Sequence, residues 1–224
     1  MPTSTGSGRN NFLIIFINLG GVKHAAFLLF LFILAGCGRS VPARHFPTES
    51  MRTGDLVFRC GRGVLSRAVV MAEQMDGRYS HVGVLIRDVD GVWKVAHSVP
   101  AEREFNGDFD RVKFEPLEAF LSPKMAARGC LVHVGSLTDP VRLQALCDEA
   151  RQAFRDSVRF DHDYDLADSS KVYCTEFIWL LFKHYGLDLS EGRRRYVNLM
   201  SIRGDILLPE HILQYKDNTV YYQF

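Results

Sequence analysis

The chain reads VYCTEF at residues 172–177, and this stretch places a cysteine at the point where a polar loop turns into a helix. The preceding loop, residues 161–168, is acidic, whereas residues 174–185 carry apolar side chains at helical spacing. A thiol attacks only as the thiolate, and the amino terminus of a helix lowers a thiol pKa. Cys174 is therefore the candidate nucleophile. The alternative is an inert cysteine buried in the core, which is the commoner fate of a free thiol.

A histidine heads the first of two neighbouring strand signals. Residues 79–83 read YSHVG, and strands are expected over 81–87 and 92–98, with a turn at 88–91. The imidazole of His81 would take the proton of the thiol and later pass it to the leaving group. Alternatively, it is a strand-end histidine bonded to a backbone carbonyl.

His97 is the candidate for a third residue that orients the imidazole of His81. A two-residue turn at 90–91 would place the two rings on opposite faces of the hairpin. A three-residue turn at 89–91, with its glycine left-handed, pairs position 97 with Gly83. The two histidines then share one face, with their alpha carbons roughly 7–8 Å apart on a diagonal. Because the glycine leaves space for a ring, the sequence predicts the three-residue turn.

The remaining patterns predict an α+β fold in one domain spanning residues 51–224. Strands are expected at 55–58, 112–114 and 129–134, and a helix begins at Asp139, followed by a proline in its first turn. A further helix is expected over 64–75, with an apolar stripe formed by Val64, Leu65, Ala68, Val69 and Ala72. Strands come first and helices follow, which favours an antiparallel sheet packed against helices.

Residues 1–36 resemble a bacterial export signal. Residues 25–35 form an uncharged apolar run, which is too short to span a bilayer, and Lys23 precedes it. Residues 34–37 read LAGC and resemble a lipobox, in which Cys37 receives the lipid before cleavage. The signal is longer at its start than export requires, and Val22 as a misread initiator would give a normal length. The alternative is a single transmembrane anchor.

The sequence after the signal predicts a tether over residues 37–50, which contain two prolines and no apolar periodicity. Three acyl chains on Cys37 would hold the protein stably at a membrane. The prediction is a lipid-anchored protein that faces the periplasm of a Gram-negative cell, and Gly38 favours the outer membrane by resemblance to sorted lipoproteins.

Composition narrows the function classes. The chain of 224 residues has 27 Lys and Arg against 26 Asp and Glu, a net charge of +1, which argues against a nucleic-acid binder. Apolar residues make up 47% of the chain, which is enough for a real core. Cys60, Cys130 and Cys147 have apolar neighbours and are expected to pack without reacting. No cofactor or metal is expected, because adjacent residues such as Asp161, His162 and Asp163 splay apart and no second cluster completes a site.

Four motifs resemble the circularly permuted, NlpC-type papain-like cysteine peptidases, in particular the YiiX/YebB-like group. They are GDLVF at 54–58, YSHVG at 79–83, YCTEF at 173–177 and LLPEHI at 207–212. The order of histidine before cysteine marks the permutation. The resemblance implies a papain-like fold from about residue 51 onward.

The resemblance also implies roles for individual residues. Cys174 would be the nucleophile and His81 the base, with backbone amides near the helix start as oxyanion donors. Tyr173 and Tyr164 are candidates for substrate or oxyanion support. Close relatives often carry a glutamate where this chain has His97, and a tyrosine–aspartate pair that either 160–161 or 164–165 would match.

Three functions follow as hypotheses. The first is a cysteine hydrolase that cleaves an amide bond, with a cell-wall peptide as the expected substrate. The second is acyl transfer or lipid deacylation, because lecithin:retinol acyltransferase-like proteins share the permuted fold and the Cys–His pair. The third is a non-catalytic envelope lipoprotein that binds a ligand. Apolar side chains beside the cysteine would favour lipid, whereas fixed carboxylate-binding groups would favour peptide.

Overall fold

The computed structural model describes residues 44–73, 77–101, 108–199 and 202–224. The predicted export signal and Cys37 lie outside the described residues. One compact unit spans Ala43–Phe224, and both hydrophobic core clusters lie within it. We therefore expect this unit to fold without residues 1–42. Among the helices of the described residues, none is long and apolar enough to cross a membrane.

The folded unit starts earlier than residue 51, because the last residues of the predicted tether pack on the sheet. Arg44 donates a hydrogen bond to the carbonyl of Ala126 (3.1 Å). Phe46 meets Tyr222 edge-on, with the ring centroids 5.8 Å apart. The tether prediction for 37–50 therefore overlaps the domain over residues 44–50.

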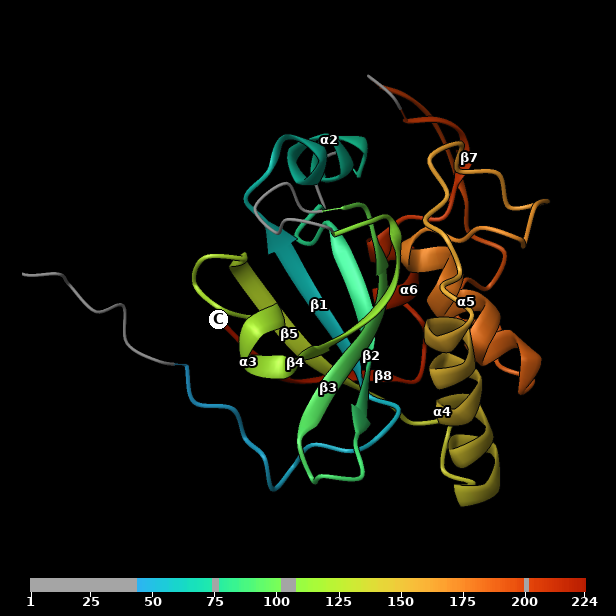
Figure 1. Cartoon of the computed structure of the whole chain (residues 1–224). Helices are drawn as coiled ribbons and strands as arrows, with labels where there is room; N and C mark the ends of the chain where they lie inside the picture. Colours follow the sequence, from blue (N-terminus) through green and yellow to red (C-terminus); the bar gives the residue numbers. More distant parts are fainter. Residues whose placement is uncertain (1–43, 74–76, 102–107, 200–201) are drawn as a thin grey trace, which may run out of the picture. The chain divides into compact units, whose positions relative to one another are not determined.

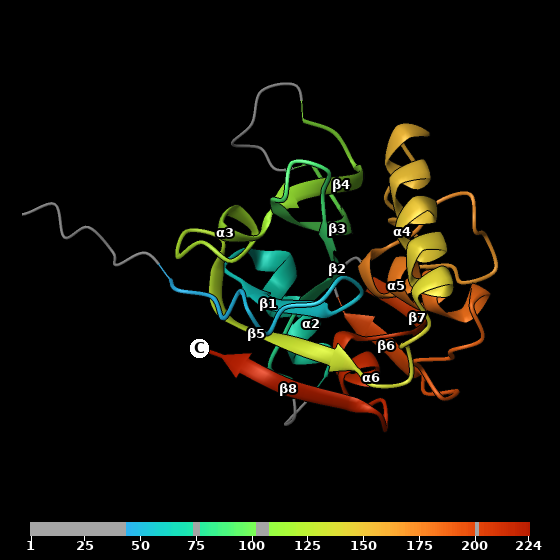
Figure 2. The same ribbon diagram turned by 90° about the horizontal axis from the view of Figure 1, so that it is seen from below.

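The main sheet has six antiparallel strands in the order β4-β3-β2-β1-β5-β8 (Figure 1). Their bounds are β1 Leu56–Gly61, β2 His81–Arg87, β3 Trp93–Val99, β4 Arg111–Pro116, β5 Ala126–Val134 and β8 Asn218–Gln223. The five strands expected from the sequence are confirmed. The sequence did not predict β8, which pairs with β5 at the edge of the sheet (Figure 2).

The sheet is covered on both faces, which explains why its strands read as nearly continuous apolar runs. Leu56 and Phe58 of β1 point to the larger core, whereas Val57 between them points to a smaller core. The larger core packs against α4 (Pro140–Arg155) and α5 (Cys174–His184), which lie side by side on one face in both views. The smaller core is closed by the short helix α3 (Leu117–Phe120).

Smaller elements surround one end of the sheet. They are α2 (Val64–Ala72), the two-stranded sheet of β6 (Arg195–Leu199) and β7 (Ile202–Ile206), and α6 (Pro209–Leu213). Figure 1 shows α2 standing beyond the end of β1 rather than on a face of the sheet.

The apolar stripe predicted for α2 is only partly buried. Ala68 and Ala72 are buried, but Val64 is 64% exposed and Leu65 is 37% exposed. The periodicity predicts a helix correctly, yet the stripe is not a core face along its whole length, because the first turn of α2 extends past the sheet.

Candidate active site

Cys174 is the first residue of α5, as the sequence predicts. The start of this helix is held against the segment before α6. The Thr175 hydroxyl donates to the carbonyl of Leu207 (2.5 Å), and the amide of Leu207 donates to the Tyr173 hydroxyl (3.0 Å). The Glu176 carboxylate accepts from the amide of Tyr173 (3.3 Å). These bonds fix the direction of the first turn and hence the position of the thiol.

His81 and His97 lie on one face of the sheet and touch. The pairing of Val84 with Ala96 continues to pair Gly83 with His97, which is the register of the three-residue turn. Gly91 in that turn has φ of +80°. Nε2 of His81 lies 2.8 Å from Nδ1 of His97. The predicted turn and the predicted contact are both confirmed.

A fourth residue, which the sequence analysis missed, extends this chain of contacts. Nε2 of His97 lies 3.4 Å from a carboxylate oxygen of Glu115 on β4, without meeting hydrogen-bond geometry. Arg59 approaches the same carboxylate (4.0 Å) and lies over the ring of Phe120 (4.2 Å). His97 thus lies between His81 and Glu115 and contacts both.

The order of these contacts selects one pair of tautomers. A carboxylate beside Nε2 of His97 favours the proton on that nitrogen, so that Nδ1 accepts from Nε2–H of His81. Nδ1 of His81 then carries a lone pair, and it makes no hydrogen bond to any residue that the structure describes. This nitrogen is the one available to take the proton of a thiol.

Burial sets the protonation states of the resting site. Desolvation lowers the pKa of His81 well below its usual value, and Arg59, His97 and Lys113 lower it further. Burial also lowers the pKa of His97, although Glu115 opposes this shift. Both imidazoles are therefore neutral at pH 7.

The expectation of a lowered thiol pKa is wrong for this resting structure. Burial raises the pKa of Cys174 to about 11, even though the backbone amides of Val82, Thr175 and Cys174 itself act on the sulfur and lower it. The backbone amides at the helix start lower the thiol pKa as predicted, but desolvation of the thiolate raises it by more. The resting pair is thus a neutral thiol beside a neutral imidazole, and His81 must remove the proton during attack.

A pH profile of alkylation tests this protonation state. The modification rate of Cys174 by iodoacetamide, followed by peptide mass mapping, should rise about tenfold per pH unit from pH 7 to pH 10, because the thiolate fraction is limiting. An ordinary thiol of pKa about 8.5 would level off near pH 9. A rate that reaches its plateau below pH 8 would show a preformed thiolate–imidazolium pair instead.

Cys174 and His81 line one cleft of about 390 Å³ at the end of β1. Its lining is mostly apolar and comes from α2, β7, the loop before α5 and the segment before α6. The apolar members are Leu65, Val69, Val99, Pro100, Met125, Phe160, Ile202, Ile206, Leu207, Leu208 and Pro209. Arg59, Arg62 and Lys124 are its cations, and no acidic side chain among the described residues lines it.

The two predicted tyrosines have different places. Tyr173 is buried, lines the cleft and supports the backbone of Leu207 through its hydroxyl. Tyr164 also lines the cleft, packs against Tyr173 (centroids 5.2 Å apart) and has its pKa raised by burial and by the charge of Cys174. Its hydroxyl makes no hydrogen bond within the described residues, so it is the better placed of the two to meet a substrate.

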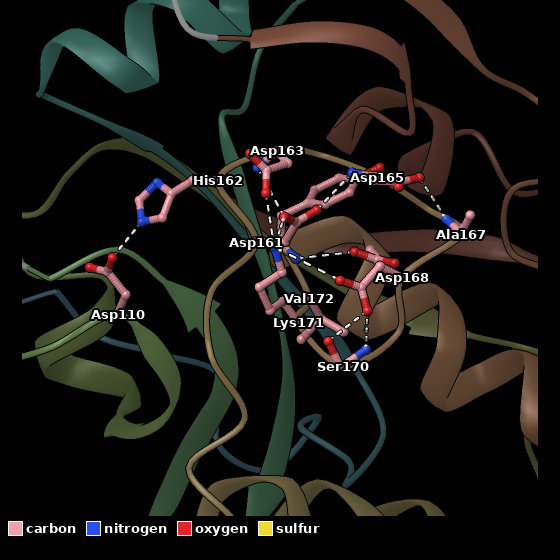
Figure 3. A network of polar contacts seen from close by, with 12 residues as sticks. Asp110, Asp161, His162, Asp163, Asp165, Ala167, Asp168, Ser170, Lys171 and Val172 are labelled. Carbon is pink, nitrogen blue, oxygen red and sulfur yellow. Dashed lines mark hydrogen bonds and ion pairs between the residues drawn. The ribbon is translucent and has the colours of Figure 1, made fainter.

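The acidic loop before α5 holds an internal ion pair. Asp161 is fully buried and accepts from the amides of Asp163 (2.9 Å) and Asp165 (2.7 Å). The ammonium of Lys171 lies between Asp161 (3.6 Å), Asp163 (2.8 Å) and Asp168 (3.9 Å), as Figure 3 shows. The loop therefore carries its own cation, and it presents Phe160 and Tyr164 to the cleft. Of the two pairs left open by the sequence, only 160–161 has a buried aspartate.

The other three cysteines of the described residues are unpaired. Cys130 and Cys147 are buried in the larger core, which raises the pKa of each to about 11. Cys60 is half-buried.

Comparison with known proteins identifies the family. Residues 50–197 match the family model described as permuted papain-like amidase enzyme, YaeF/YiiX, C92 family. The chain belongs to this family. It is thereby a papain-like cysteine amidase with an α+β fold, as the motifs predicted. A search of curated protein sequences returned no match.

A solved structure shows the same fold at low identity. The crystal structure of metalloprotein yiiX from Escherichia coli O157:H7 aligns with a TM-score of 0.62 and 16% identity, covering 77% of this chain and 97% of that one. That protein is described as a metalloprotein. In the present chain, no group of three or more His, Cys, Asp or Glu within the described ranges is arranged to hold a metal ion.

Proposed function

We propose that the protein hydrolyses an amide bond through an acyl-enzyme on Cys174, with His81 as base and then acid. The observation that carries this is that Cys174, at the start of α5, and His81 line the same cleft, while the contact of Nε2 with His97 leaves Nδ1 of His81 without a hydrogen bond among the described residues. The sulfur attacks the carbonyl carbon while Nδ1 takes its proton. The proton then goes to the leaving amine as the carbon–nitrogen bond breaks, and water releases the acid.

Backbone amides beside the sulfur support the oxyanion in this proposal. The amides of Cys174, Thr175 and Val82 all act on the thiol in the resting structure. Donors that already point at the nucleophile need little reorganisation when charge develops on the substrate oxygen beside it. The hydroxyl of Tyr164 is the side-chain candidate for the same role.

The lining of the cleft favours an amide whose acyl side carries an apolar chain. Eleven apolar residues surround the cysteine, and none of the described lining residues is acidic. Burying an alkyl chain there gains about 0.8 kcal/mol per methylene. Of the two enzymatic hypotheses, the lining therefore supports a lipid-like substrate best, combined with the amide chemistry of the family.

A cell-wall peptide is the second candidate, and the cations at the cleft favour it. The guanidinium of Arg62 is held by a hydrogen bond to the carbonyl of Pro123 (2.9 Å), and Lys124 is its neighbour in the lining. These groups suit a carboxylate of a peptide as well as they suit an anionic lipid. Membership in an amidase family favours both over a non-catalytic ligand-binding role.

A comparison of digests separates these substrates. Wild-type protein and Cys174→Ala are incubated with long-chain N-acyl amino acids, with phospholipid and with peptidoglycan fragments, and the products are read by mass spectrometry. The expected result is Cys174-dependent release of fatty acid from the N-acyl amino acid. Cys174-dependent products from peptidoglycan alone would move the assignment to the peptide, and no such product from any substrate would contradict the hydrolase.

We also propose that Cys37 carries the lipid that holds this enzyme in the cell envelope, facing the periplasm, with the outer membrane favoured. The support is the LAGC stretch at 34–37 after an apolar run. The intact mass of the protein purified from bacterial membranes should exceed that of residues 37–224 by a lipid. The variant Cys37→Ser should lose that mass and leave the membrane fraction when the membranes are washed with high salt; an unchanged mass would contradict the proposal.

A further inference from the structure

The outer face of α2 is unusually apolar for a solvent-exposed helix. Val64 is 64% exposed and Met71 is 65% exposed, and seven residues of separation place both on one side of the helix. Arg67 lies between them on the same side and is exposed. The adjacent side of the helix is buried through Ala68 and Ala72. A helix with this arrangement has a core face and, beside it, a face that is exposed among the residues that the structure describes.

The exposed charged side chains of residues 61–72 are all positive. From Arg59 to Ala72 the chain has three arginines and no acidic residue. Arg62 and Arg67 are exposed, whereas the first acid that follows, Glu73, is 2% exposed. Apolar side chains interleaved with cations are typical of helices that lie in the interface of an anionic membrane.

The small sheet contacts the end of α2 but does not extend its exposed face. The Arg195 side chain at the start of β6 donates a hydrogen bond to the carbonyl of Ala72 (3.1 Å). Tyr196 is 62% exposed, but it points to the other side of β6 and pairs with the exposed Asp205. The face is therefore confined to α2 and the loop before it.

The cleft opens beside this face, because the same helix forms its wall. Leu65 and Val69 of α2 line the cleft that holds Cys174. A surface that contacts α2 would therefore lie next to the entrance of the cleft. Because the exposed apolar and cationic side chains of α2 adjoin an apolar cleft, a lipid surface fits this face better than a soluble partner does.

We propose that the α2 face, formed by Arg62, Val64, Arg67 and Met71, docks on an anionic lipid bilayer and places the entrance of the Cys174 cleft against it. The inference goes beyond the proposed hydrolysis and does not depend on it. Membrane contact through α2 is also distinct from a lipid on Cys37.

Vesicle sedimentation with the unit 43–224 tests the docking. The unit is mixed with vesicles of phosphatidylethanolamine and phosphatidylglycerol (3:1) or of phosphatidylcholine alone. We expect binding to the anionic vesicles that weakens as salt is raised, because exposed charges are screened. Val64→Ser/Met71→Ser should reduce the partition coefficient at least tenfold, and Arg67→Gln should reduce it only on anionic vesicles.

Two controls isolate the face and separate it from catalysis. Val89 is 99% exposed and Val141 is 77% exposed, on a turn and on α4, so Val89→Ser/Val141→Ser removes equally exposed apolar side chains elsewhere. That variant and Cys174→Ala should bind as wild type. Absence of binding by the wild type, equal loss in the control variant, or a lipid-free dimer that Val64→Ser/Met71→Ser dissolves would overturn the proposal.

Discussion

Cys174→Ala is expected to lower amide hydrolysis by about 10³-fold or more, because the covalent route is lost with the nucleophile. Cys174 is half-buried and lines the cleft, and its replacement by Ala removes a single atom, so the variant should fold and keep its unfolding temperature within a few degrees. The measurement is kcat/KM on the substrate found by the digests, together with the thermal transition.

Cys60→Ser is the matched control for this change. Cys60 is the other half-buried cysteine, and the residue after it, Gly61, lines the same cleft. Its replacement should leave kcat/KM within about twofold. Retention of more than a tenth of the activity in Cys174→Ala, or an equal loss in Cys60→Ser, would contradict the assignment of the nucleophile.

His81→Ala is expected to lower kcat by about 10²- to 10⁴-fold, the usual contribution of a positioned proton acceptor. With a thiol pKa of about 11, almost no thiolate forms without the base at neutral pH. Activity of the variant should therefore recover in part as pH is raised towards 10. A variant whose activity falls without any recovery at high pH would indicate a structural role for the ring.

Glu115→Gln tests the contribution of the carboxylate that lies beside His97. The carboxylate raises the pKa of His97, so its loss should make protonation of the histidine pair less favourable and lower kcat by about tenfold. The acid limb of the kcat profile should move to lower pH, with KM unchanged because Glu115 does not line the cleft. Glu118→Gln, on the exposed side of α3, should change neither quantity.

The sequence predicts the hairpin that joins β2 and β3 because turn chemistry and strand alternation are local. The left-handed glycine at 91 and the open position at Gly83 were enough to place His97 beside His81. Glu115 and Arg59 reach this pair only through the pairing of β4 with β3 and of β1 with β2. Such pairings join distant segments, and one sequence does not specify them.

Two other differences have a common physical cause in burial. The pattern of α2 predicts an apolar stripe that packs on the core, but the first turn of the helix extends past the sheet and leaves Val64 exposed. The position of Cys174 at a helix start predicts a thiolate, but burial of the side chain raises its pKa. The local sequence predicts where a helix begins and ends, whereas the solvent exposure of the residues at its start depends on the whole fold.

The most direct test of the central claim is the site of acylation during turnover. Wild-type protein is mixed with an activated anilide of a medium-chain fatty acid, quenched in acid within the first turnover and mapped by peptide mass spectrometry. The account predicts one acyl group on the peptide that contains Cys174, and its absence in His81→Ala at neutral pH. Turnover with no acyl group on Cys174, or with the acyl group on another residue, would contradict it.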